Sequence, residues 1–168
     1  VESGPAAGAL AARWFARGLE EDRLLAIDMG GTTAKATLID GFEPELTNTF
    51  EVARIYRFKK GSGFPVSVPS VDLVEIGAGG GSLAKADQFG LLKVGPESAG
   101  AEPGPASYDQ GGEVAAVTDA DVLLGMLDPN SFLGGDMPLN ELKAKEAVSV
   151  ISDELDLSET ETAAGIHE

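Results

Sequence analysis

Residues 24–40, LLAIDMGGTTAKATLID, place a Gly-Gly-Thr-Thr segment between two apolar runs, and this pattern constrains the fold more than any other. The runs 23–29 and 34–40 are short and rich in apolar or β-branched residues, which predicts two strands joined by a tight turn. Such a hairpin can be purely structural. It can also be half of a phosphate site, because a glycine turn exposes backbone N–H groups that no side chain covers.

The residues around this turn suit a nucleotide with magnesium. The hydroxyls of Thr32 and Thr33 can add hydrogen-bond donors for phosphate oxygens. Asp28 would repel phosphate unless a Mg²⁺ ion, which usually keeps several waters, lies between the two groups. A simple β-turn accounts for the same residues, so both interpretations stay open from the residues alone.

A second glycine motif, EIGAGGGS, covers residues 75–82 and follows another apolar run. Three consecutive glycines suit a backbone that passes close either to a flat ligand or to another segment of the chain. The motif is neither the dinucleotide fingerprint nor a P-loop, because the required spacing and the Gly-Lys-Ser/Thr end are missing. Glycine and proline then dominate up to residue 112, apart from an expected hairpin around 82–95, and a loop this long is commonly functional.

The remaining segments predict an α/β chain with strands first and helices after. Residues 4–19 predict a buried, alanine-rich helix whose bulky side chains are Leu10, Trp14, Phe15 and Leu19, and we expect Trp14 to pack rather than bind a ligand. Residues 47–58 alternate like a third strand, and residues 71–79 form a fourth apolar run.

The last third of the sequence is expected to be helical. Thr118 with Asp121, and Ser158 with Glu161, have the spacing of capping boxes at two helix starts. Between them, residues 138–155 are amphipathic. The side chains expected near one face are Leu139, Leu142, Val148, Ile151 and Leu155.

Composition excludes several classes of function. The formal charge of −16 disfavours nucleic acid and acidic membranes as partners, and no apolar run reaches the roughly 20 residues that cross a bilayer. The basic stretch 54–60 is expected to be a solvated strand or loop, with an anion contact as the alternative. The chain has no cysteine, which excludes thiolate chemistry and fits a cytoplasmic location. The only histidine, His167, has no carboxylate at a recognisable spacing and is expected to be a surface or interface residue.

Taken together, the motifs resemble a known family. The order of an alanine-rich helix, DMGGTT and GAGGGS is similar to the second half of the actin-like ATPase superfamily. More narrowly, SGPAAG, DMGGTTAK, VEIGAGGGSLA, VGPESAGAEPGPASY, TDADVLLGMLDP and FLGG resemble consecutive motifs of the hydantoinase A/oxoprolinase family. The resemblance implies a ribonuclease-H-like α/β subdomain over residues 1–168, with an antiparallel or mixed sheet and flanking helices, truncated at both ends.

The resemblance also implies a function. Members are ATP-dependent hydrolases of cyclic amides such as hydantoins and 5-oxoproline, or related carboxylase subunits that act on ketones, and both are expected to phosphorylate a carbonyl or enol oxygen. ATP and Mg²⁺ are the implied cofactors. The implied partners are the rest of a longer chain and a second, hydantoinase B-type subunit, so residues 1–168 alone are not expected to turn over substrate.

Site residues carry over from the family motifs by position. Asp28 is the candidate catalytic residue and, through a magnesium-bound water, a candidate metal contact. The expected contacts to phosphates and magnesium are Asp28, Gly30, Gly31, Thr32 and Thr33. The expected contacts to the nucleoside are Gly77, Gly79, Gly80, Gly81 and Ser82.

The chain departs from its relatives at several of these motifs. Many relatives carry an aspartate at Lys35, and a lysine there could instead reach a phosphate. Some carry a histidine just before the glycine loop, where this chain has Glu75 as a candidate metal acceptor, and many have a cysteine at Ser107. The resemblance gives the 98–105 loop the role of an active-site wall and Asp119 a role at a helix start.

Two other functions compete with this reading. The chain could be a nucleotide-responsive binding or assembly module of the actin-like superfamily without small-molecule chemistry. It could also be a structural support inside a multisubunit enzyme, in which case both glycine motifs are turns. The Gly/Pro-rich stretch 95–112 suits the lining of a site better than a protein interface, which favours the enzyme.

Overall fold

The computed structural model describes residues 3–53, 55 and 61–168. The chain divides into two compact units. Unit 1 combines the residues up to Met29 with Thr33–Gly77, and unit 2 combines Gly30–Thr32 with Ala78–Glu168. The expectation of a single subdomain over 1–168 stays a prediction. The basic stretch 54–60 lies outside the described residues, apart from Ile55.

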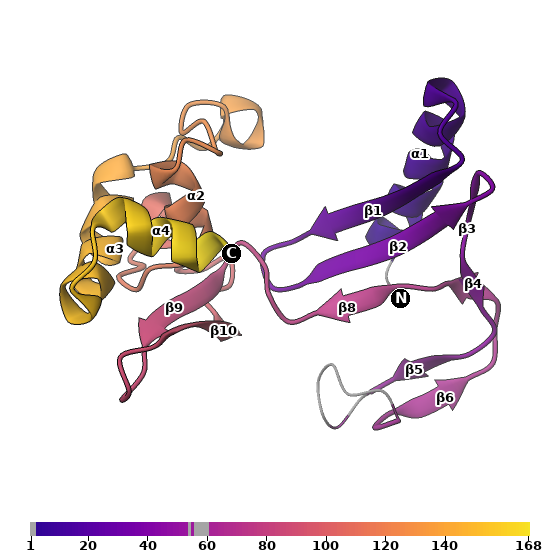
Figure 1. Cartoon of the computed structure of the whole chain (residues 1–168), viewed down its shortest axis with the longest axis horizontal. Coiled ribbons are helices and arrows are strands. Elements are labelled where there is room, and N and C mark those ends of the chain that lie inside the picture. Colours follow the sequence, from indigo (N-terminus) through magenta and orange to yellow (C-terminus); the bar gives the residue numbers. More distant parts are fainter. Residues whose placement is uncertain (1–2, 54, 56–60) are drawn as a thin grey trace. The chain divides into compact units, whose positions relative to one another are not determined.

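The predicted hairpin forms the centre of the main sheet in unit 1. Strands β1 (Arg23–Met29) and β2 (Ala34–Asp40) pair antiparallel along their full length (Figure 1). The other edge of β2 pairs near its end with β3 (Glu43–Pro44) and near its start with β8 (Val74–Ile76). The two strands predicted from residues 24–40 are therefore confirmed, and the fourth apolar run supplies β8.

The strand predicted over residues 47–58 forms in part, at Phe50–Val52, but the expectation that it is the next strand of the main sheet is wrong. The chain continues along β2 only as far as Glu45, whose N–H donates to the Leu38 carbonyl at 3.0 Å. Residues 46–71 form two small antiparallel ladders instead. These are β4 (Leu46–Thr47) with β7 (Ser70–Val71), and β5 (Phe50–Val52) with β6 (Phe64–Val66).

Helix α1 (Ser3–Leu19) lies on one face of the main sheet (Figure 1). Its position is confirmed, but its burial is not as predicted. The small residues Ala9 and Ala16 are buried, whereas Trp14 is 72% exposed and packs edge-on against Phe15. Small side chains let the helix backbone approach the strands closely, while the bulky Leu10, Trp14, Phe15 and Leu19 all remain exposed.

The opposite face of this sheet is apolar. Alternate residues of a strand point to opposite faces, so the positions that face away from α1 form one surface. These residues are all exposed large hydrophobics: Leu25, Ile27, Met29, Leu38, Val74 and Ile76. Unit 1 thus has one sheet face covered by α1 and one that exposes apolar side chains.

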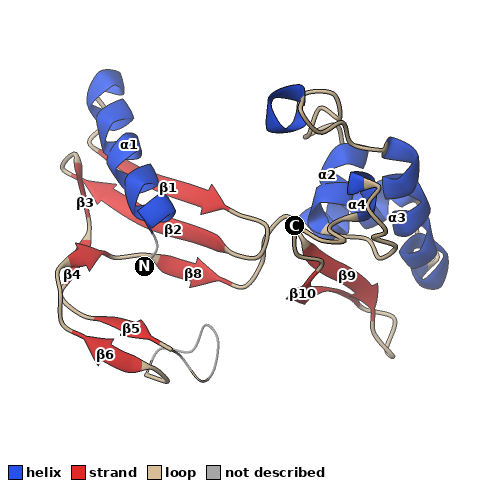
Figure 2. Cartoon of the chain, turned by 180° about the vertical axis from the view of Figure 1, so that it is seen from behind, coloured by secondary structure: helices blue, strands red, loops and turns tan. Residues whose placement is uncertain are grey.

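Unit 2 packs helices against a short hairpin (Figure 2). The hairpin consists of β9 (Ser82–Ala86) and β10 (Leu92–Ser98), as predicted for residues 82–95. The helices are α2 (Val117–Leu123), α3 (Glu141–Leu155) and α4 (Glu159–His167), with short 3₁₀ helices at Ala106–Tyr108 and Phe132–Gly135. Their buried side chains form one main core, to which Val117, Ala120, Val148, Ile151 and Ile166 belong.

The helix starts follow the predicted signals in part. The Ser158–Glu161 capping box is confirmed, because each residue's side chain bonds to the other's backbone N–H. The Thr118–Asp121 box is wrong: α2 begins at Val117, and its third residue, Asp119, bonds back to the N–H of Ala116.

The buried face of α3 contains more small residues than predicted. Leu142 is 72% exposed, whereas Ala144 and Ala147 are buried beside Val148.

The α/β class with antiparallel sheets and flanking helices is confirmed. In the part of the chain that the structure describes, no helix has both the length and the apolar character to cross a membrane.

Candidate functional site

The two glycine motifs meet within unit 2. The backbone N–H of Gly80 donates to the carbonyl of Gly30 at 3.0 Å, and that of Gly81 donates to the carbonyl of Gly31 at 2.7 Å. The hydroxyl of Ser98 lies at the weak limit of a third contact, 3.4 Å from the same Gly31 carbonyl. The carbonyls of the turn are therefore fixed by the glycine loop.

The backbone N–H groups of the same turn have no partner among the described residues. The backbone N–H groups of Gly30, Gly31 and Thr32 make no hydrogen bond within the described residues, and all three residues are exposed. A turn whose carbonyls are tied down and whose successive N–H groups are open can bind an anion without losing internal hydrogen bonds. This is the arrangement that a phosphate contact requires.

The backbone N–H groups of the three consecutive glycines, Gly79, Gly80 and Gly81, are all used by internal hydrogen bonds. The N–H of Gly79 donates to the Ser82 hydroxyl at 2.9 Å, and the N–H groups of Gly80 and Gly81 are used by the turn. The carbonyl of Gly81 accepts from Ala99 at 2.8 Å. Any contact of Gly79, Gly80 or Gly81 with a nucleoside would thus be made by van der Waals surface and not by their backbone N–H groups.

Close approach between chain segments explains why this loop is glycine. A Cβ atom added to Gly81 would lie 2.8 Å from the Gly31 carbonyl oxygen, and one added to Gly80 would lie 2.9 Å from the Thr118 hydroxyl. Gly79, Gly81 and Ser82 are buried. Of the two interpretations left open by the sequence, close passage of another chain segment is the one that these contacts satisfy directly.

A buried carboxylate holds the loop that follows. Asp119 is fully buried, and its carboxylate accepts from the N–H groups of Ser107 at 2.7 Å, Ala116 at 2.8 Å and Ala106 at 3.1 Å. Its helix-start role is therefore confirmed, and it also fixes the start of the 3₁₀ helix at Ala106–Tyr108. Burial raises the pKa of Tyr108, and the charge of Asp119 raises it further.

In unit 1, three of the sequence-predicted residues form one row across the sheet. Asp28 on β1 lies opposite Lys35 on β2, and Lys35 lies opposite Glu75 on β8. Side chains directly opposite one another in a ladder lie on the same face, so this row combines two carboxylates with an ammonium between them. The predicted Asp28, Lys35 and Glu75 are brought together by the fold.

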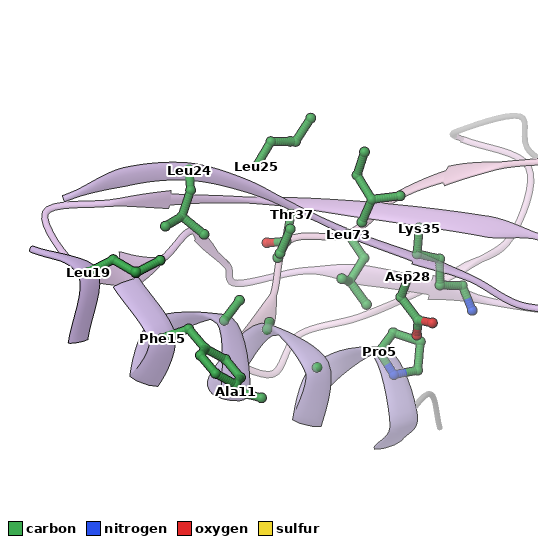
Figure 3. Close-up of a pocket in the computed structure, with 15 residues that line it drawn as sticks. Pro5, Ala11, Phe15, Leu19, Leu24, Leu25, Asp28, Lys35, Thr37 and Leu73 are labelled. Carbon is green, nitrogen blue, oxygen red and sulfur yellow. The ribbon is translucent and has the colours of Figure 1, made fainter. Parts of the chain in front are cut away.

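A cleft of about 390 Å³ lies between α1 and this face of the sheet. Its walls are mainly apolar, and Leu24, Thr37 and Leu73 line it from the sheet side. Asp28 and Lys35 lie at one end of it, while Leu19 lies at the other (Figure 3). The cleft is therefore amphipathic, with its charged groups gathered at the Asp28 end.

The row is poorly suited to a bare metal ion. Among the described residues no group of three or more His, Asp or Glu side chains could hold a metal. Lys35 lies between Asp28 and Glu75, and its charge offsets theirs. Such a row suits a magnesium ion that arrives with phosphate better than one bound by protein ligands alone. The metal role of Glu75 stays a prediction.

One pair was missed by sequence reasoning. The Nδ1 atom of His167 at the end of α4 lies 2.7 Å from a carboxylate oxygen of Asp121 on α2. His167 is exposed, as expected for a surface residue, and its carboxylate partner lies 46 positions away in the sequence. Only the packing of α2 against α4 brings them together, so no local spacing could have revealed the pair.

Comparison with known proteins places the chain in a family. The hydantoinase/oxoprolinase family profile matches residues 1–168. The chain is 39% identical over 167 residues to caprolactamase subunit alpha of Pseudomonas jessenii, covering 99% of this chain and 23% of that one. It is 40% identical over 164 residues to the acetophenone carboxylase gamma subunit of Aromatoleum aromaticum, covering 96% and 21%.

Solved structures agree with these sequence matches. A crystal structure of the ATP-dependent caprolactamase from Pseudomonas jessenii superposes with a TM-score of 0.77 at 38% identity, over 99% of this chain and 23% of that one. A nucleotide-free acetone carboxylase, studied for ATP-dependent acetone carboxylation, superposes with a TM-score of 0.76 at 31% identity, over 98% and 22%. The chain spans about a quarter or less of the length of these relatives. It belongs to the hydantoinase/oxoprolinase family.

Proposed function

We propose that this chain contributes a phosphate-binding segment to an ATP-dependent enzyme that opens cyclic amides or carboxylates ketones. The observation that carries the proposal is the set of free, exposed N–H groups at Gly30, Gly31 and Thr32. Relatives whose names refer to ATP-dependent caprolactamase and acetone carboxylation make ATP the anion to test first. An enzyme of this kind needs further segments and subunits, as the name caprolactamase subunit alpha indicates for that relative.

The roles of the side chains follow from their chemistry. The three N–H groups and the Thr32 and Thr33 hydroxyls would donate to phosphate oxygens, and Lys35 would add a positive charge. Asp28 would accept from the water shell of a magnesium ion. ATP would supply the phosphoryl group that activates an unreactive carbonyl or enol oxygen. The part of Gly77, Gly79, Gly80, Gly81 and Ser82 would be to shape the nucleoside contact.

The proposal gives Lys35 a role in offsetting charge. A phosphate group carries negative charge, and in water an exposed carboxylate beside it is unfavourable. Lys35 stands directly across from Asp28 in the ladder. The ammonium would therefore offset the charge of Asp28 for any phosphate that approaches this row.

Titration of the chain with ATP in the presence and absence of Mg²⁺, followed by calorimetry and by backbone amide shifts, tests the proposal. We expect magnesium-dependent shifts at Gly30, Gly31 and Thr32. Asp28→Ala should weaken Mg-ATP binding by about tenfold or more, the usual scale for a hydrogen bond to a charged group. Asp40→Ala is the matched control, because Asp40 is exposed at the far end of the same hairpin.

Turnover separates the enzyme from a binding module. The natural polypeptide that carries this chain should release ADP faster when a cyclic amide or a ketone is added. Binding that Asp28→Ala leaves unchanged, or ATP hydrolysis that no lactam, hydantoin, 5-oxoproline or ketone stimulates, would refute the proposed function.

A further inference from the structure

The first turn of α2 is bonded to the glycine loop by one residue. The backbone N–H and the hydroxyl of Thr118 both donate to the carbonyl of Gly80, each at 2.8 Å. Thr118 is the second residue of the helix, where a free N–H is expected and a side-chain hydroxyl more often bonds locally. Here the hydroxyl bonds to a segment 38 positions away.

This contact continues to the phosphate turn through a single residue. Gly80 accepts from Thr118 at its carbonyl and donates from its N–H to the carbonyl of Gly30. The same carbonyl-fixing ladder continues from Gly81 to Gly31. Thr118 is therefore two hydrogen bonds away from the residues whose N–H groups would meet a phosphate.

The contacts leave little room for independent movement. A Cβ atom added to Gly80 or Gly81 would lie less than 3 Å from a neighbouring atom. The neighbouring segments are therefore already in close contact with both glycines. In a close-packed region of this kind a displacement passes to the next residue instead of being absorbed. Thr118 is itself buried and belongs to a helix that packs on α3 and α4.

We propose that Thr118 is the residue that positions the Gly30–Thr32 turn for phosphate binding, acting through Gly80. The inference rests on the proposed function, because it assigns a purpose to the geometry of that turn. Thr118 is a positioning residue and touches no ligand. Its hydroxyl holds Gly80 at the distance that keeps the turn's carbonyls fixed and its N–H groups turned outward.

Three variants test this role. Thr118→Val keeps the shape and the backbone N–H but removes the hydroxyl, and Thr118→Ser keeps the hydroxyl. Thr162→Val is the matched control in the same unit, because Thr162 is equally buried on α4 and its hydroxyl bonds only to Ser152 among the described residues. Ser152 keeps a second partner in the carbonyl of Val148, so this control leaves no buried donor unpaired.

Two measurements are made on each variant. Amide hydrogen exchange at Gly80 and Gly81 reports the loop directly, and we expect roughly 3- to 10-fold faster exchange in Thr118→Val, the scale of one lost hydrogen bond. Calorimetric titration with Mg-ATP should show a similar fold-loss of affinity in Thr118→Val only. Thr118→Ser should restore both values, and Thr162→Val should match the wild type in both.

Each outcome either supports or overturns the positioning role of Thr118. Equal exchange at Gly80 and Gly81 in Thr118→Val and Thr162→Val would overturn the inference. So would faster exchange with unchanged Mg-ATP affinity, since the loop would then move without consequence for the turn. Failure of the wild type to bind Mg-ATP would reject the proposed function, and the inference would fall with it. The exchange rates at Gly80 and Gly81 would still show whether the Thr118 contact holds the loop, so the two failures can be told apart.

Discussion

Replacing Asp119 by alanine should strongly destabilise unit 2. The carboxylate is fully buried and accepts three backbone N–H groups, two from the 3₁₀ helix and one from the start of α2. Alanine would leave all three donors buried without a partner. At about 1–3 kcal/mol for each unsatisfied group, partly relieved by entering water, we expect a loss of about 4 kcal/mol.

Asparagine at the same position makes the estimate sharper. One oxygen of Asp119 serves both Ala106 and Ala116, and the other serves Ser107. Asp119→Asn can keep one oxygen on the first pair, but its NH₂ group would then face the N–H of Ser107. With one donor unsatisfied and the charge lost, we expect about half of the alanine effect, roughly 2 kcal/mol.

Native-state amide exchange measures this loss where it occurs. The slowest amides of α3 report the free energy of opening unit 2, and the amides of β1 and β2 report unit 1 in the same sample. Asp153→Ala, at an exposed position of α3, is the control. An Asp119→Ala variant that loses less than about 1 kcal/mol in unit 2 would refute the reasoning, because one unsatisfied donor alone should cost that much.

Two further predictions concern unit 2. The hydroxyl of Ser107 is buried with no hydrogen-bond partner among the described residues, so Ser107→Ala should leave the urea midpoint unchanged or raise the stability by up to about 1 kcal/mol, and a clear loss would contradict this. The hydroxyl and then the backbone N–H of Ser158 lower the pKa of Glu161 from its usual 4.5, so the capping box of α4 stabilises above that pH and is lost as the pH falls below it. Glu161→Gln should make the amide protection factors in α4, which are corrected for the intrinsic pH dependence of exchange, vary less between neutral and acid pH. The remaining dependence is due to Glu159, whose pKa is lowered by Ser149 and Lys145.

Local signals were enough for the elements that depend on local contacts. The strands of residues 24–40 were readable because the turn lies between two short apolar runs, and the Ser158–Glu161 box because a cap involves residues three positions apart. The same three-residue spacing led to a wrong capping box, Thr118 with Asp121, at the start of α2. There Asp119 fits the cap, and Thr118 and Asp121 instead bond to Gly80 and His167, which are distant in sequence.

Burial and strand pairing were harder to predict because they depend on what remains after close packing. Leucine, phenylalanine and tryptophan indicate a core in most helices, yet α1 and α3 bury alanines against their neighbours. Likewise, alternation predicts that residues 47–58 contain a strand but not its partner. The pairing with β2 ends after Glu45, and β8 occupies the other half of that edge.

The two glycine motifs look alike in sequence but have opposite uses of their backbone. At Gly30 and Gly31 the carbonyls are bound and the N–H groups have no partner among the described residues, whereas at Gly79, Gly80 and Gly81 the N–H groups are bound. Glycine permits close approach in both cases, so its presence alone cannot tell a ligand contact from a chain contact. What distinguishes them is the hydrogen-bond inventory of each peptide. By that criterion the turn is the segment with donors open to the proposed anion, and the glycine loop is the segment that fixes the turn's carbonyls.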